Sequence, residues 1–252
     1  MAKRIFNMMR YFKITIFLFF LFSDIFVSAQ TSNKVLIYNA YIQGNMKKWE
    51  NVIVSFEKQK PATIDEKLEL ISYYYGYIGY LLGVKNYEKA AINIDKGDKL
   101  IADVLKQAPK NATAFAFKGS FIGFRIGMSK FKAITLGPES SKSIAHALQL
   151  EPGNIQAHVD KANALYHTPG LFGGDKKQSL KLFLKASTLL EKSKQTDNNW
   201  FYLNVLTLTA KNYESLEQWQ NAKAIYEKIM RFSPDYKWVK NELYPTLLKK
   251  MD

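Results

Sequence analysis

The residues best suited to chemistry lie in a glycine-rich stretch, HTPGLFGGDKKQSLKLF, from His167 to Phe183. Glycines and lysines at the start of a helix are typical of phosphate-binding loops, because backbone N–H groups and ammonium groups can face one anion. The spacing is not that of a P-loop, since Asp175 separates Gly174 from the lysines and the preceding segment has helical periodicity. We therefore expect a connector between two helices, with anion binding as the alternative.

The composition of this loop supports the connector. Pro169 ends the preceding helix, and Gly173 and Gly174 supply backbone angles that other residues resist. Asp175 is placed to cap the next helix, where its carboxylate accepts the free N–H groups that a phosphate would need. Gln178, three residues later, suits the second half of a capping box.

Other reactive side chains show no catalytic spacing. The three histidines, His146, His158 and His167, form no HExxH motif and have no metal-site spacing, and no serine lies in a GxSxG elbow. The chain has no cysteine, which excludes disulfides and thiolate metal sites. We expect no catalytic residue, no metal and no cofactor, and predict that the protein is not an enzyme. An unrecognised hydrolase is the last alternative.

The N-terminal segment has the order of charges and apolar residues that is typical of a signal peptide. Four basic residues precede the apolar run Ile14–Phe22, and the small residues of Val27–Ala29 follow it. Nine apolar residues are fewer than the ~20 that span a bilayer. We expect residues 1–29 to be cleaved, leaving a chain from about Gln30 without a transmembrane segment. The periplasm is the expected location, and secretion is the alternative.

The net charge narrows the range of partners. The whole sequence carries +14, and without residues 1–29, which hold four basic and one acidic side chain, 32 basic and 21 acidic residues leave +11. Such an excess in a cytosolic protein would suggest nucleic acid. Outside the cytoplasm the polyanions are lipid headgroups, envelope polymers and acidic proteins. We therefore expect no nucleic acid partner. The lysines are scattered, as on solvated helix faces.

The elements that position these residues repeat along the chain. Similar breaks recur after helical segments, and four of them contain a proline, at Pro61, Pro109, Pro152 and Pro234. A period of about forty residues is typical of a helix pair, since two helices of ~14 residues and their turns use that length. The segment Trp219–Phe232 has its apolar residues three and four apart, which predicts one buried stripe. No segment alternates strictly enough to predict a strand.

Small and aromatic residues in these helices resemble the pattern of the tetratricopeptide repeat (TPR) family. The last unit carries Ala210, Tyr213, Ala222, Tyr226 and Pro234 at the family's spacing, with Ile229 as the one departure. The middle unit carries Ser140, Ile144, Ala147 and Pro152, and Gly119 and Ala162 stand ten residues after a proline. In the first unit, Trp49 stands where a small residue is usual.

The resemblance implies an all-α, right-handed α-solenoid with about five helix-turn-helix pairs and a C-terminal capping helix. Neighbouring pairs must stack, because one helix pair cannot bury its own apolar face. The repeat domain is expected over residues 30–252, with a final helix interrupted or ended near Pro245. The expected units are about 31–61, 62–109, 110–152, 153–196 and 197–234, followed by a cap over 235–252.

The loop from His167 adds a second resemblance. A helix that ends in Tyr or His, followed by PxxFGGD and lysines, is similar to exported bacterial TPR proteins, including the periplasmic T component of TRAP-type transport systems. This resemblance implies an accessory or scaffold role instead of a reaction.

Aromatic residues are dense in SYYYGYIGY (Ser72–Tyr80) and FAFKGSFIGFRIG (Phe115–Gly127). Most must form the core, but a helix with aromatic residues all round is expected to expose some of them. In TPR-like arrays the first helix of each pair lines the concave groove, so we predict a groove that binds a protein or peptide partner. A hydrophobic small molecule, bound by a transport accessory, is the alternative ligand. The groove candidates are Tyr77, Tyr80, Phe124, Asn163, Tyr166 and Lys211.

Overall fold

The computed structural model describes residues 32–251, to which all structural statements refer. The predicted signal peptide, residues 1–29, lies outside the described residues. Eleven α-helices and no strand occur in residues 32–251, so the prediction of an all-α, TPR-like solenoid is confirmed. No helix of this part of the chain is long and apolar enough to span a membrane.

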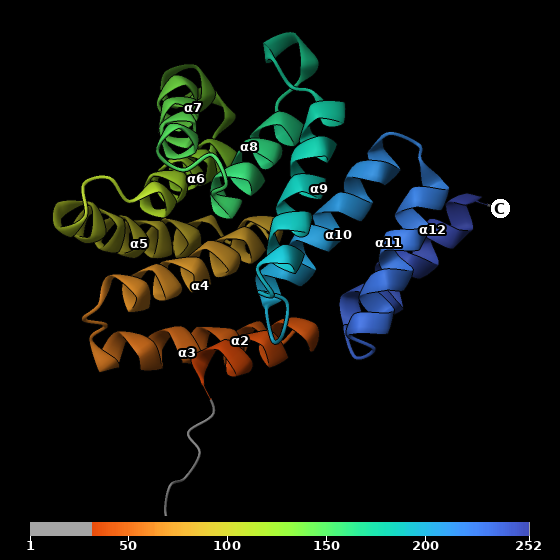
Figure 1. The fold of residues 1–252 in the computed structure, drawn as a ribbon, viewed down its shortest axis with the longest axis horizontal. Helices are drawn as coiled ribbons and strands as arrows, with labels where there is room; N and C mark the ends of the chain where they lie inside the picture. The colour runs from red at the N-terminus through yellow and green to blue at the C-terminus, as the bar shows by residue number, and fades with distance from the viewer. Residues whose placement is uncertain (1–31, 252) are drawn as a thin grey trace, which may run out of the picture. The chain divides into compact units, whose positions relative to one another are not determined.

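Consecutive helices pack in pairs, and each pair stacks on the next (Figure 1). A final helical segment contains the π-helical turn η3 (Val239–Leu243) and continues as α12 (Tyr244–Met251). The five pairs are α2 (Asn33–Ile42) with α3 (Met46–Gln59), α4 (Ile64–Gly83) with α5 (Tyr87–Gln107), α6 (Ala112–Met128) with α7 (Ala133–Leu150), α8 (Ile155–His167) with α9 (Lys176–Lys192), and α10 (Trp200–Ser215) with α11 (Trp219–Phe232).

Side-chain caps fix where most of these helices begin. At each capped start, an Asn, Thr or Asp oxygen accepts a hydrogen bond from a free N–H group of the first turn, which is worth about 1 kcal/mol. Thr63 and Glu66 form a complete capping box at the start of α4. The capping residues are Asn45, Thr63, Asn86, Asn111, Asn154, Asp175 and Asn199.

Small residues allow the two helices of a pair to approach closely. A Cβ added at Gly119 of α6 would lie 2.5 Å from Ile144 Cγ1 and 2.9 Å from the Ser140 carbonyl oxygen of α7. The Ser140 hydroxyl also donates to the Gly119 carbonyl at 2.8 Å. In the next pair, the Ser179 hydroxyl donates to the Ala162 carbonyl at 2.7 Å. The small residues of the TPR-like pattern thus lie at helix–helix contacts, as predicted.

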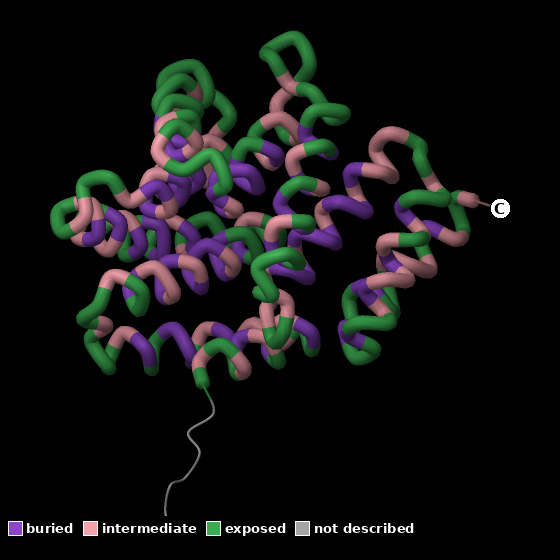
Figure 2. Tube along the Cα trace, in the orientation of Figure 1, coloured by how far each residue is buried: buried purple, intermediate pink, exposed green. Residues whose placement is uncertain are grey.

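The tyrosine-rich helix α4 is covered on almost every side. The expectation that this helix exposes some of its aromatic residues holds only for Tyr80, since Tyr73, Tyr74, Tyr75 and Tyr77 are buried. Helices α3, α5 and α6 pack against α4, and the ring of Trp200 at the start of α10 reaches Gly76. In Figure 2, buried residues line the sides of the helices that face their neighbours.

The array closes on itself through aromatic residues. Trp49 of α3 and Trp200 of α10 meet edge to face with 4.9 Å between ring centroids, and a Cβ at Gly76 would lie within 3 Å of both indoles. The large Trp49 replaces the usual small residue because Gly76 opposite leaves it room, and its indole N–H donates to the Tyr73 carbonyl at 2.9 Å.

Helix α2 extends this closing contact to the C-terminal pair. Tyr41 packs against Trp200 at 5.8 Å and against Tyr236 at 5.1 Å, and its hydroxyl donates to Asn204 at 3.3 Å. The Tyr38 hydroxyl donates to Ser233 at 3.1 Å. Helix α2 contacts α10, and in Figure 1 the two lie close to each other at the lower end of α10. The described helices therefore form a tightly curved array whose first pair contacts the fifth.

The C-terminal segment is interrupted and does not end at Pro245. Five residues of π-helix, Val239–Leu243, precede Pro245, the second residue of α12. The helix continues through this point, since the Tyr244 N–H donates to the Val239 carbonyl five residues earlier. The π-helical turn thus interrupts the regular α-helical hydrogen bonding just before a residue that has no N–H group.

Candidate functional site

Side chains from the first helices of three other pairs, α6, α8 and α10, pack around Tyr75 of α4 and fill the inner face that these first helices form. Asn163 donates its amide to the Tyr75 hydroxyl at 3.2 Å. The Tyr75 ring lies 5.3 Å from Phe124 and 6.3 Å from Phe201. Two of the predicted groove residues, Phe124 and Asn163, are thus brought together, but they help to fill the inner face around the buried Tyr75.

A buried carboxyl group lies beside this cluster. Asp160 accepts a hydrogen bond from Gln156 at 2.9 Å, whereas its second oxygen has no hydrogen-bond partner among the described residues. Burial raises the pKa of Asp160 to about 7, against the opposing effect of the nearby Ser120, Gln156 and Tyr75 groups. The Asp160 carboxyl group therefore titrates near neutral pH.

Tyr77 and Tyr80 lie together at the C-terminal end of α4, apart from the Tyr75 cluster. Their rings stack at 6.1 Å, and the ammonium of Lys89 in α5 lies 5.5 Å from the Tyr77 ring. Lys89 also pairs with Glu50 of α3 at 2.6 Å, so Tyr77 faces the second helices of its own and the preceding pair. None of their ring contacts involves the other four groove candidates.

Tyr166 and Lys211 lie around His167 at the C-terminal end of α8. The rings of Tyr166 and His167 meet edge to face at 5.0 Å, and the ammonium of Lys176 lies 5.9 Å from the Tyr166 ring. Lys211 of α10 places its ammonium 5.4 Å from the ring of Trp238. Partial burial, and secondarily the charge of Lys211, lower the pKa of His167. Both effects favour the neutral imidazole.

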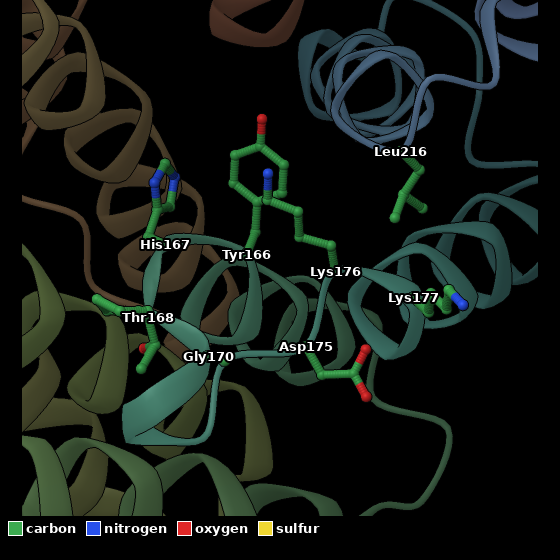
Figure 3. A pocket seen from close by; sticks show the side chains of 10 residues that line it. Tyr166, His167, Thr168, Gly170, Asp175, Lys176, Lys177 and Leu216 are labelled. Atoms are coloured by element: carbon green, nitrogen blue, oxygen red, sulfur yellow. The ribbon is translucent and has the colours of Figure 1, made fainter.

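A hollow of about 570 Å³, open to solvent, lies beside these residues (Figure 3). The end of α8, the following loop, the start of α9 and Leu216 after α10 enclose it. Figure 3 shows Tyr166, His167 and Lys176 pointing to one side, whereas the carboxylate of Asp175 points away from them. The hollow thus presents an aromatic and basic surface.

The glycine-rich loop is a connector between α8 and α9, as predicted. The Asp175 carboxylate accepts a hydrogen bond from the Gln178 N–H at 2.9 Å, so the cap occupies the position that a phosphate would need. The predicted capping box is incomplete, because the Asp175 N–H donates to the Leu165 carbonyl at 3.1 Å and not to the Gln178 side chain.

The two glycines serve different purposes. Gly173 adopts φ +91°, which is a left-handed conformation that side chains disfavour. Gly174 does not need that conformation; it is required by close approach, since a Cβ there would lie 1.8 Å from the Thr168 carbonyl oxygen.

Sequence reasoning missed two residues here: His167, which lines the hollow, and Trp238, whose ring lies 5.4 Å from the Lys211 ammonium. In the sequence, His167 ends a predicted helix and has no metal-site spacing, and Trp238 is only part of the cap. Their contacts join α8, α10 and the residues after α11, so no local pattern could have revealed them. Among the described residues, no group of three His, Cys, Asp or Glu side chains could hold a metal ion.

Comparisons with known proteins agree with the fold. No family model matches this chain, and no curated protein matches it in sequence. The HusA haemophore from Porphyromonas gingivalis is similar in structure, with a TM-score of 0.57 and 16% identity over 74% of this chain and 96% of that chain. A thermophilic TPR protein from Thermus thermophilus is also similar, with a TM-score of 0.55 and 12% identity over 86% of this chain and 100% of that chain. At these identities the likeness concerns the fold, which is a TPR-like helical array.

Proposed function

We propose that this protein is an exported, non-enzymatic scaffold that binds an acidic segment of a protein partner at the hollow beside α8. The observation that carries the proposal is the set of lysines there. Lys176 and Lys177 line the hollow, and Lys211 lies near enough to His167 to act on its charge. Within the described residues these three lysines form no ion pair, and Asp175 is engaged as a helix cap.

The chemistry of the hollow suits such a segment. Lysine ammonium groups attract carboxylates, and the ring of Tyr166, which lines the hollow, offers a large apolar contact with few rotatable bonds. The inner face around Tyr75 is filled, so we place the partner at the hollow beside the C-terminal end of α8 and not along the whole inner face. Of the six predicted groove residues, Tyr166 and Lys211 are the two that the proposal keeps as partner contacts.

Site-specific crosslinking in the native cell tests this proposal. We expect a photoreactive amino acid in place of Tyr166 to capture one acidic partner, and the charge reversal Lys211→Glu to abolish that capture. The control is the same label at Tyr87, an exposed residue at the start of α5. Identical products from both positions, or capture unaffected by Lys211→Glu, would contradict the proposal.

A second candidate is a flat, anionic small molecule of the haem type, which the likeness to a haemophore suggests. The hollow contains the side-chain types that such a ligand needs. Tyrosine and histidine, here Tyr166 and His167, are residue types that serve as axial ligands of haem iron, and lysines can pair with the carboxylates of the ligand. The lowered pKa of His167 keeps its imidazole neutral, as metal binding requires.

Titration with haemin distinguishes this candidate from the first. Binding at the hollow predicts a change in the Soret band of haemin that is lost in Tyr166→Phe/His167→Ala, with Tyr87→Phe as the control. A spectrum that matches free haemin would exclude this candidate and leave the protein partner. Export to the periplasm and kinship with T components of transport systems stay predictions that a fractionation of the native cell can test.

A further inference from the structure

The four most exposed large hydrophobic side chains of the described residues lie at two helix connections. Phe131, in the connection from α6 to α7, and Ile134, in the first turn of α7, are 92% and 85% exposed. Leu171 and Phe172, in the connection from α8 to α9, are 97% and 80% exposed. The other exposed large hydrophobic residues range from 37% to 54%. Figure 2 shows the connection after α8 exposed along most of its length.

The two loops occupy equivalent positions at one edge of the array. Contacts that recur in constant register show that helices α6 and α8 run parallel. Asn154 donates to Thr113, 41 residues before it, and Ala157 shares a small buried cluster with Ala116, also 41 residues before it. Near the middle of the helices, Ser120 lies beside Asp160. The same register places the end of α6 beside the end of α8, where each loop starts.

Each loop also has the same local structure. A single 3₁₀ turn follows the first helix of the pair, at Lys130–Lys132 in one loop and at Gly170–Phe172 in the other. The aromatic residues of these turns, Phe131 and Phe172, are both exposed. We call residues 129–137 and 168–175 together the double-loop edge.

Lysines flank these apolar tips. Lys130 and Lys132 lie in the first loop, and Lys176 and Lys177 follow the second; at least part of each side chain is accessible to solvent. Helices α7 and α9 have no acidic residue in the first turn, although the positive end of a helix dipole disfavours lysine there. Helix stability therefore does not account for Lys176 and Lys177, and none of the four lysines forms an ion pair within the described residues.

We propose that the double-loop edge binds the surface of an anionic lipid bilayer, with the apolar tips inserted among the headgroups and the lysines paired with lipid phosphates. The edge is formed by protruding tips and not by a groove, which suits insertion into a soft interface. Lysines beside inserted apolar side chains strengthen attachment to anionic lipids. The net positive charge of residues 30–252 attracts the whole domain to such a surface.

Vesicle flotation tests this proposal on residues 30–252. The apolar run Ile14–Phe22 could bind lipid by itself, and the contacts of the helical array lie within Asn33–Asp252, which forms one compact unit. We expect binding to vesicles that contain phosphatidylglycerol and much weaker binding to vesicles of phosphatidylcholine alone. Replacement of the four tips, Phe131→Ser/Ile134→Ser/Leu171→Ser/Phe172→Ser, should weaken binding by about tenfold or more without changing the circular dichroism spectrum.

Two matched controls separate this edge from general stickiness. Val54→Ser/Ile92→Ser changes exposed apolar residues outside both loops, in α3 and α5, and should leave binding unchanged. Lys130→Gln/Lys132→Gln should weaken binding more than Lys106→Gln/Lys110→Gln, which removes the same charge at the connection from α5 to α6.

The proposal is overturned if neither kind of vesicle binds, or if phosphatidylcholine alone binds equally well. If the two lysine pairs had equal effects, the attraction would come from the net charge of the domain and not from this edge, and the proposal would also be overturned. A concentration-dependent dimer that the four serine substitutions abolish, without vesicle binding, would assign the edge to a second copy of this chain instead.

Discussion

Asp160 is the residue whose chemistry depends most on its surroundings. It lies on α8, almost completely buried, and one carboxylate oxygen has no hydrogen-bond partner within the described residues. Burial of a charge that is incompletely hydrogen-bonded disfavours the ionised form, which is why the pKa rises to about 7. An ordinary carboxyl group in the unfolded chain has a pKa of about 3.9.

The raised pKa predicts that stability falls as the pH rises. Between pH about 4 and 7 the folded state keeps the Asp160 proton that the unfolded state has lost. The free energy of unfolding therefore falls as the pH rises from about 4 to about 7 and levels off above that. Asp160→Asn, which stays neutral, should gain stability over the natural protein by about 3 kcal/mol between pH 5 and pH 8. Urea unfolding at both values measures this difference, in which the contributions of the histidines cancel. A difference that does not change with pH would show that Asp160 is not protonated.

Two glycines on α4 give a matched test of the packing. Gly76→Ala places a methyl group within 3 Å of both Trp49 and Trp200 and should destabilise the protein by about 1–3 kcal/mol. Gly79→Ala on the same helix meets no atom within 4 Å and should stabilise it by about 0.5–1 kcal/mol. Urea midpoints of the two variants provide the comparison. Equal effects would mean that the two indoles move apart freely.

At the scale of the element, the start of α9 depends on one side chain. The Asp175 carboxylate fixes the start of α9 by accepting a hydrogen bond from the Gln178 N–H. The Asp175 N–H itself donates to the Leu165 carbonyl. The cap therefore acts alone, without the reciprocal bond of a capping box.

We predict that Asp175→Ala lowers the free energy of unfolding by about 1 kcal/mol, whereas Asp175→Asn, which keeps an accepting oxygen, loses less. Chemical denaturation followed by circular dichroism measures both. Partner capture at Tyr166 should persist in each variant. Loss of capture with unchanged stability would mean that Asp175 contacts the partner directly.

At the scale of the whole described array, the closing contact changes how the repeats cooperate. Repeat arrays usually gain stability from neighbouring units, so their end units can fray independently. Here the first pair contacts the fifth through Trp49, Trp200 and Tyr41. We therefore expect the first and last helices to unfold together with the middle.

A double-mutant cycle measures this coupling. Trp49→Ala and Trp200→Ala should each cost about 3–5 kcal/mol, with an interaction energy between them on the order of 1 kcal/mol or more. Trp219, on α11, does not contact Trp49 in the hydrophobic clusters, so the Trp49→Ala/Trp219→Ala pair should be additive. Additive effects of Trp49→Ala and Trp200→Ala would mean that the array does not close in solution.

The sequence alone determined the helices and their pairing. The apolar stripe of Trp219–Phe232, the recurring prolines, the N-cap Asp175 and the small residues Gly119 and Ala162 act over a few residues or between neighbouring helices, so they can be read from spacing. Only the tertiary structure decided which aromatic residues are exposed. Curvature brings Trp200 onto Gly76 and His167 next to Lys211, and it buries most of the tyrosines of α4. Curvature accumulates from small rotations between successive pairs, and no single motif encodes that sum.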